Sequence, residues 1–190
     1  MQYSIEDIKI PVTLPVYRTI IPPEDYNLKE IIEDYRKENE EIAYRSNVKA
    51  WHSDWNTHKK DSRFQPIIDR AIDVCEYINR EYINILLKLE CYEFWAAQYQ
   101  RTEYALPHRH YPVDWACVYY VELEDNSSPI VFLNDPSALE GFPIAVKPGM
   151  MLFFPGHMYH GVPPTQGKRT VLAMNLVKNF PDGEGYNIQK

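Results

Sequence analysis

The sequence is poor in cysteine and in basic residues, and both shortages exclude classes of protein. Only three cysteines occur in 190 residues, widely spaced and without a Cys-x-x-Cys pair, so neither a disulfide framework nor a thiol redox motif is expected. Cys75, Cys91 and Cys117 have apolar neighbours, which favours positions in the core. Lys and Arg total 20 against 27 Asp and Glu, and the resulting net charge of −7 argues against a nucleic-acid partner.

Long apolar runs are also missing. No stretch reaches the roughly 18 apolar residues that a membrane-spanning helix needs, and residues 1–7 have neither the basic start nor the apolar stretch of a signal peptide. We therefore expect a cytoplasmic protein with no membrane partner. What the chain does contain is a hydrophobic content of 45%, with 15 Tyr and 4 Trp, which suits one domain with a sheet-rich core.

The hydrophobic pattern changes its period about halfway along the chain. Residues 8–21 alternate apolar and polar with interleaved prolines, which predicts an edge strand or an extended arm. Residues 26–42 and 62–87 have apolar side chains at three- and four-residue steps, which predicts two amphipathic helices. From residue 89 the period is two, and strands are predicted at 91–101, 104–110, 115–123, 129–134, 143–147, 149–154 and 168–178.

This order of elements predicts a mainly β, α+β fold in a single domain that spans residues 1–190. Residues 1–88 would form the arm and helices that pack on one sheet, and residues 89–180 the β core. Short strands with Pro and Gly turns are typical of an antiparallel sandwich or jelly roll. Between the helices, residues 44–61 are expected to form a loop in which His52 and His58 have packing or surface roles, because their spacing fits neither strand nor helix pairing.

Three histidines form the most informative pattern. His108 and His110 end a predicted strand, and side chains two residues apart in a strand point to the same side. His160, on a later strand, could close a metal site and leave one side of the metal open. Neutral imidazole is the commonest protein ligand for iron, zinc and copper. His157 is the other candidate for the third position, but it lies within a turn, and His160 is favoured.

An arginine on the last predicted strand points to an anionic ligand. Arg169 shares one face of that strand with Val171, Ala173 and Asn175. A buried Arg is costly unless an anion meets it. A salt bridge to an internal acid is the alternative, but the sheet region has few acidic residues. A ligand with a carboxylate is therefore favoured.

Four blocks of the sequence together carry a resemblance to a known family. The blocks are Ser46–Asp54, then His108-Arg109-His110 with Val118-Tyr119-Tyr120, then Ile130–Pro136, and last Gly149–Pro155 with His160 and Arg169. In their order and spacing, over about residues 44–178, they resemble the iron(II)- and 2-oxoglutarate-dependent oxygenases, in particular a small branch common in marine bacteria and phages. The resemblance implies a double-stranded β-helix core of the jelly-roll or cupin type.

The resemblance also implies a co-substrate site and a reaction. Arg169 would hold the distal carboxylate of 2-oxoglutarate with help from the Tyr120 hydroxyl. Tyr99 would reach the end nearer the metal, and Asn175 would line the same pocket. The implied activity is hydroxylation of an unidentified primary substrate by O2, coupled to decarboxylation of 2-oxoglutarate to succinate.

One position departs from the wider superfamily, which has His-x-Asp or His-x-Glu. This chain has His110 at the acidic position, as the branch commonly does, so the resemblance implies His108, His110 and His160 as the iron ligands. Asp114 is the alternative to His110, or else a partner that orients the His110 ring. Three neutral imidazoles leave the full dipositive charge on the metal, which should alter its reactivity toward oxygen.

Two other functions remain open. A three-histidine dioxygenase of the cupin type, which does not use 2-oxoglutarate, explains the missing carboxylate but leaves Arg169 and Tyr120 without a role. A non-catalytic, metal-binding β-sandwich is the second alternative. The sequence does not indicate the primary substrate, and the proline-rich N-terminal arm could pair with a second copy in a homodimer.

Overall fold

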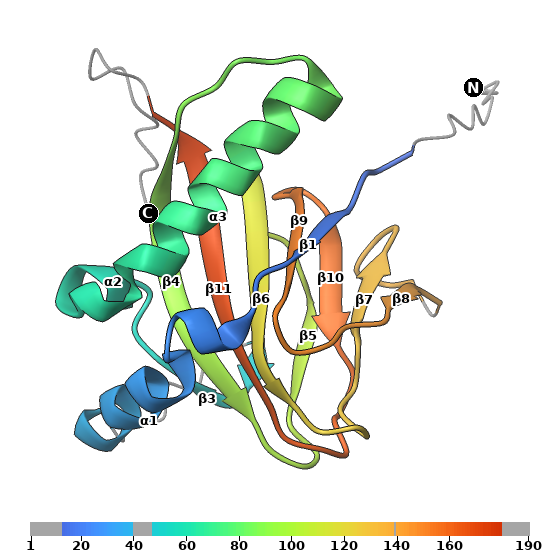
Figure 1. Ribbon diagram of the computed structural model, residues 1–190. Helices are drawn as coiled ribbons and strands as arrows, with labels where there is room; N and C mark the ends of the chain where they lie inside the picture. The colour runs from blue at the N-terminus through green and yellow to red at the C-terminus, as the bar shows by residue number, and fades with distance from the viewer. Residues whose placement is uncertain (1–12, 40–46, 139, 180–190) are drawn as a thin grey trace, which may run out of the picture.

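The computed structural model describes residues 13–39, 47–138 and 140–179. The start of the predicted N-terminal arm, the end of the first predicted helix and Ser46 lie outside these ranges. Within them, two antiparallel sheets face each other and the helices cover the outer face of one (Figure 1). This is a double-stranded β-helix with N-terminal helices on one sheet, as the sequence predicts.

The two sheets divide the strands unequally. The larger has the order β1-β9-β6-β11-β4-β3, and the smaller has the order β2-β5-β10-β7-β8. The larger sheet contains β1 (Tyr17–Ile20), β3 (Trp51–His52), β4 (Leu89–Tyr99), β6 (Trp115–Leu123), β9 (Met150–Pro155) and β11 (Arg169–Lys178). The smaller contains β2 (Val48–Lys49), β5 (Tyr104–His108), β7 (Ile130–Leu133), β8 (Phe142–Ile144) and β10 (Tyr159–Val162).

The helices are α1 (Leu28–Glu38), α2 (Thr57–Lys60) and α3 (Gln65–Ile78), with 3₁₀ turns η1 (Pro23–Asp25) and η2 (Ser62–Phe64) and a π-helical turn η3 (Asn79–Ile83). In Figure 1, α3 crosses the front of β4, β11 and β6. Its apolar stripe, which includes Ile67, Ile68 and Ala71, is buried in that contact. Burial of each isoleucine side chain contributes about 1.5–3 kcal/mol, so this stripe fixes the helix on the sheet.

Three short strands were not predicted, although the short strands β7 and β8 overlap predicted ones. The unpredicted strands are β10, with four residues, and β2 and β3, with two residues each, which is too few to show a period. β2, β3 and α2 all fall in the segment 44–61 that was expected to be a loop. The predicted second helix ends early, because Asn84 has the left-handed φ of 60° that follows the π-helical turn.

The central strand β11 separates two cores. Leu172, Met174 and Leu176 face the helices, whereas Val171 and Ala173 face the smaller sheet. Arg169 and Asn175 have the same parity as Val171 and Ala173, so their side chains also point between the sheets. The functional side chains predicted on this strand therefore occupy one face, and the apolar side chains that hold the helices occupy the other.

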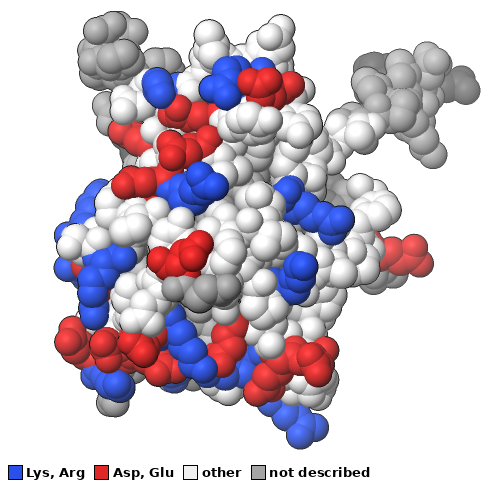
Figure 2. Space-filling view, viewed as in Figure 1, with Lys and Arg blue, Asp and Glu red and all other residues white. Residues whose placement is uncertain are grey.

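Charge is distributed over the helical side of the molecule in both signs. Figure 2 shows Lys and Arg side chains interspersed with Asp and Glu over the helices and along the lower edge of this face. Ion pairs in this mixture include Lys29–Glu122 at 2.8 Å and Lys60–Asp54 at 2.5 Å. In the described part of the chain, no helix is both long and apolar enough to span a membrane.

Candidate metal centre and co-substrate pocket

Three imidazoles meet between the sheets. β5 ends at His108, and the antiparallel register places His160 of β10 directly opposite it. His110 follows two residues after His108, and its Nε2 lies 3.3 Å from Nε2 of His160. One ring nitrogen from each of the three lies within 4.8 Å of the others. This spacing lets a single cation contact all three.

Backbone carbonyls orient two of these rings. Nδ1 of His108 lies 2.7 Å from the Leu106 carbonyl, and Nδ1 of His160 lies 3.0 Å from the Met158 carbonyl. A carbonyl accepts hydrogen bonds only, so each Nδ1 is the protonated nitrogen, and each Nε2 keeps its lone pair for a metal. A hydrogen bond of this kind on the nitrogen remote from the metal is common in metal sites.

Burial keeps the three imidazoles neutral. It lowers the pKa of His108, lowers that of His110 to about 3, and lowers that of His160 well below the ordinary value. The neighbouring imidazoles add repulsion, which lowers the pKa values of His110 and His160 further. Neutral imidazole is the form that binds metals. No proton therefore has to leave these rings before a metal can bind.

A close backbone contact positions His110. Its backbone N–H donates to the Gly156 carbonyl over 2.7 Å, and the Gly156 N–H donates to the Asp114 carbonyl over 3.1 Å. A Cβ atom on Gly156 would lie 2.4 Å from the carbonyl oxygen of Val113, so only glycine allows this approach. The turn at Pro155-Gly156 thereby brings His110 to the end of β10, where His160 lies.

The structure does not bring the alternative ligands to the cluster. Asp114 accepts a hydrogen bond from the Lys178 backbone N–H over 2.9 Å and forms an ion pair with the Lys178 side chain at 3.3 Å. It thus joins the loop after His110 to the end of β11. His157 is exposed in its turn. His110 and His160 are therefore the residues that join His108, and their role as iron ligands stays a prediction.

Arg169 is buried and has no carboxylate partner among the described residues. Its side chain is 1% exposed, and Nη1 donates to the Ser128 carbonyl over 2.8 Å. Among the described residues, no Asp or Glu forms an ion pair with Arg169, and its Nε has no hydrogen-bond partner. The rings of Tyr99 and Tyr120 lie 5.2 and 5.4 Å from the guanidinium carbon. Since a buried charge needs an anion, this arrangement fits a bound carboxylate.

Two tyrosines supply polar atoms beside Arg169. The Tyr120 hydroxyl is buried and has no hydrogen-bond partner among the described residues. Burial raises the pKa of Tyr120 to about 12, although Arg169 opposes the shift, and burial also raises the pKa of Tyr99. Tyr120 therefore stays protonated and can donate a hydrogen bond to an anion. A cavity of about 150 Å³ is lined by Arg169, Tyr99 and the three histidines together.

Asn175 lies toward the other end of β11. Six residues separate it from Arg169, which corresponds to about 20 Å along a strand, and it is not among the residues that line the cavity. Its amide nitrogen donates instead to the carboxylate of Glu93 on β4, over 2.7 Å. The predicted contact between Asn175 and the co-substrate stays untested.

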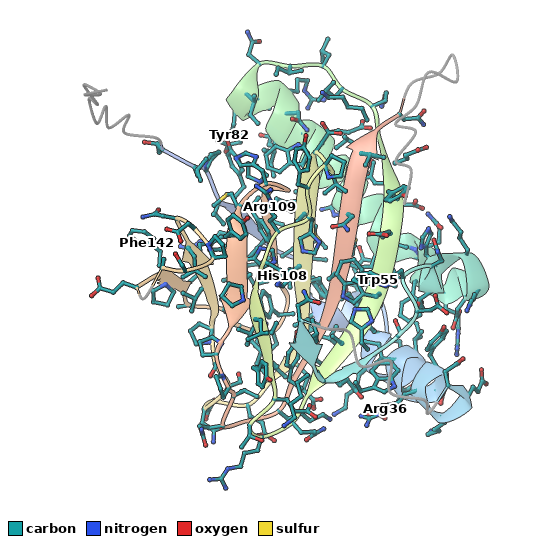
Figure 3. All side chains as sticks on the ribbon, turned by 180° about the vertical axis from the view of Figure 1, so that it is seen from behind. Arg36, Trp55, Tyr82, His108, Arg109 and Phe142 are labelled. Carbon is teal, nitrogen blue, oxygen red and sulfur yellow. The ribbon has the colours of Figure 1, made fainter. Side chains whose placement is uncertain are left out.

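A group of aromatic rings beside His110 was not predicted from the sequence. The Trp95 ring lies 5.7 Å from the His110 ring, His52 stacks on Trp95 at 5.5 Å, and Trp55 meets Trp95 edge-on at 4.5 Å. His52 lines the cavity through the short pairing of β3 with β4, whereas His58 packs on Phe94. Figure 3 shows His108 near the centre of the molecule and Trp55 at a similar height. Strand alternation could have identified Trp95, which has the same parity as Tyr99.

Solved structures share this fold at low sequence identity. A prolyl-4-hydroxylase from Pseudomonas putida aligns at 13% identity with a TM-score of 0.64, over 88% of this chain and 95% of that one. A prolyl hydroxylase from Trichoplax adhaerens, in complex with a hypoxia inducible factor peptide, aligns at 12% identity with a TM-score of 0.62, over 90% and 87%. The alpha-ketoglutarate-dependent epimerase SnoN of nogalamycin biosynthesis aligns at 9% identity with a TM-score of 0.63, over 93% and 88%.

These likenesses establish the fold class. The chain has the double-stranded β-helix that 2-oxoglutarate- and iron(II)-dependent oxygenases share. No protein-family model matches the sequence, and no curated protein matches it either.

Proposed function

We propose that this protein is an Fe(II)- and 2-oxoglutarate-dependent oxygenase that hydroxylates an unidentified substrate and converts 2-oxoglutarate to succinate. One observation carries the proposal. A buried Arg169, with no carboxylate partner in the described part of the chain, and three neutral imidazoles face the same small cavity. The first needs an anion and the second needs a cation, and 2-oxoglutarate on iron(II) satisfies both.

The donor set fits iron(II) and a dicarboxylate. Imidazole nitrogen is a suitable ligand for iron, and three ligands leave positions for a chelating co-substrate and for oxygen. Arg169 offers a planar pair of donors to a carboxylate, and the Tyr120 hydroxyl offers a third. When bound, iron and 2-oxoglutarate would supply the oxidising chemistry, which no side chain of this cavity can supply alone.

The protein's own contribution is orientation and exclusion of water. The Leu106 and Met158 carbonyls hold the His108 and His160 rings. The Phe154 ring packs on His160 at 4.8 Å, which keeps one side of the cluster apolar. Arg169 is clamped by Ser128 and two tyrosine rings, so its donors are already ordered before a ligand arrives.

The reaction itself is the test. Iron-loaded protein should form succinate from 2-oxoglutarate under oxygen, and Arg169→Met should reduce succinate formation to the level of the iron-free control. Arg70→Met is a matched control, because Arg70 is exposed on α3 and is not among the residues that line the cavity. Absence of succinate from iron-loaded wild-type protein, with a broad panel of primary substrates, would contradict the proposal.

A second candidate function follows from His110. The cluster has an imidazole where a carboxylate would complete a facial triad, and three-histidine sites also occur in dioxygenases that do not use 2-oxoglutarate. The turnover assay, run with and without 2-oxoglutarate, distinguishes the two candidate functions. Oxygen consumption that is unaffected by 2-oxoglutarate and by Arg169→Met would favour the three-histidine dioxygenase.

A further inference from the structure

The register of the larger sheet places a carboxylate just outside the cavity, two residues along β4 from Trp95, which lines it. Glu93, Asn175, Ala116 and Phe154 form one row of inward side chains, which we call the Glu93 row, and the next row contains Trp95 and Ala173. The His160 ring contacts Phe154 at 4.8 Å, and the His110 ring contacts Trp95 at 5.7 Å. The cluster is therefore level with these two rows, and Arg169 lies two rows beyond them, opposite Tyr99.

Asn175 holds Glu93 in a fixed orientation without neutralising it. Asn175 is 2% exposed, and its amide nitrogen donates to Glu93 Oε2 over 2.7 Å. Because one amide N–H donates, the carbonyl oxygen of Asn175 is left as an acceptor, and that atom has no partner within the described part of the chain. Nor does any described Lys, Arg or His form an ion pair with Glu93, which is partly exposed. The carboxylate therefore remains an acceptor with no cationic partner among the described residues.

Aromatic rings adjoin this carboxylate. The Trp55 carbonyl accepts a hydrogen bond from the Phe94 backbone N–H over 2.8 Å, which places Trp55 alongside the segment that contains Glu93 and Trp95. Trp55 is partly exposed and meets Trp95 edge-on. The faces of indole rings attract cations, and a carboxylate does so more strongly. An anionic acceptor beside indole rings is complementary to an organic cation.

We propose that Glu93, Trp55 and Trp95 recognise a cationic nitrogen group of the primary substrate, an ammonium or a guanidinium, at the side of the cavity that the two indole rings line. The proposal rests on the proposed function, because it assigns this side of the cavity to the substrate of the oxygenase. Asn175 acts through Glu93 as a positioning residue. If the pair were only a cross-strand contact between β4 and β11, its charge would not affect the binding of small molecules.

Three four-carbon probes of similar size test the charge preference. Butylammonium, n-butanol and butyrate are titrated calorimetrically into protein loaded with iron and 2-oxoglutarate without oxygen, at constant ionic strength, and also into the metal-free protein. Butylammonium should bind at least about tenfold more tightly than the other two, which corresponds to about 1.4 kcal/mol. Equal affinities for the three probes would overturn the proposal.

A substitution that removes the charge of Glu93 tests whether this residue causes the preference for butylammonium. Glu93→Gln keeps an acceptor for Asn175 and should remove the preference for butylammonium, whereas Glu90→Gln, the same change at an exposed position of β4, should leave it intact. Equal effects of the two substitutions would overturn the assignment to Glu93, and thermal unfolding checks that both variants fold. Binding of 2-oxoglutarate to the wild-type protein is measured separately. If that binding fails while the Glu93-dependent preference persists, the proposed function is wrong and the cation site stands.

Discussion

The two faces of the larger sheet are built from the same strands but have different roles. On the helix-facing side, β11 contributes Leu172 and Met174 to an apolar core under α3. On the inner side, the same strand contributes Arg169 and Asn175, whose buried polar atoms are incompletely paired within the described residues. The alternation of side chains along β11 thus places residues that stabilise the fold on one face and residues of the candidate site on the other. Substitutions on the helix side should change unfolding, and those on the inner side should change ligand binding.

The largest expected effect is on the inner side, at the metal cluster. His160→Ala should abolish stoichiometric iron binding, because it removes one of three donors. The free energy of unfolding of the metal-free protein should fall by about 1–3 kcal/mol, because the change leaves a cavity at a buried ring and removes the partner of the Met158 carbonyl. Metal analysis and chemical denaturation measure the two quantities. His157→Ala, in the turn before β10, is the control, and equal iron loss in both variants would contradict the assignment.

The helix-facing side should respond in the opposite way. Leu172→Ala should lower the free energy of unfolding by about 2–5 kcal/mol, because the side chain is fully buried under the helices. The variant that remains folded should bind 2-oxoglutarate as the wild type does. Denaturant unfolding and a binding titration at low temperature measure these outcomes. A loss of 2-oxoglutarate affinity without a loss of stability would show that the two faces are not separate.

Arg169 gives the sharpest contrast with Leu172. Arg169→Met should weaken 2-oxoglutarate binding by about 100-fold or more, because hydrogen bonds to charged groups contribute about 1.5–3 kcal/mol each. Stability without the co-substrate should stay within about 1 kcal/mol or rise, since replacement of an uncompensated buried charge by an apolar side chain is often neutral or stabilising. Thermal unfolding with and without 2-oxoglutarate measures both. A large loss of stability would show that Arg169 is a structural residue.

The smallest effect should come from the turn that positions His110. Gly156→Ala introduces a Cβ that would collide with the Val113 carbonyl, so the loop must shift and carry His110 with it. Misplacing one ligand should weaken iron binding by about 10–100-fold, in the range seen when groups that orient ligands are lost. A chelator competition titration measures the affinity. An unchanged affinity would mean that His110 does not need this turn, or is not a ligand.

The sequence predicts what depends on periodicity. The switch from helical to strand period near residue 89 predicts helices on one face of a jelly roll, and α3 and the long strands lie where the pattern places them. The convergence of His108 and His160 follows from strand alternation and from the order of the blocks. The parity of Arg169 on the last strand likewise predicts its inward direction.

The other features of the site depend on tertiary contacts, which produce no periodic pattern in the sequence. β3 has two residues, so His52 appears in sequence as part of a loop, although its pairing with β4 places it in the cavity wall. The choice between His110 and Asp114 depends on the turn at Gly156 and on Lys178, which is 64 residues from Asp114. The Glu93–Asn175 contact spans 82 residues and is visible only through the register of β4 and β11. Patterns within short stretches of sequence cannot predict these contacts.

The histidine cluster and Arg169 are proposed to bind 2-oxoglutarate together on iron(II). Anaerobic titration of 2-oxoglutarate into the iron-loaded protein, followed by visible absorption, measures this binding. We expect a metal-to-ligand charge-transfer band that saturates at one equivalent in the wild-type protein and requires far higher concentrations in Arg169→Met. A wild-type protein that binds iron but develops no such band, or a band with equal affinity in Arg169→Met, would show that these residues do not form a 2-oxoglutarate site.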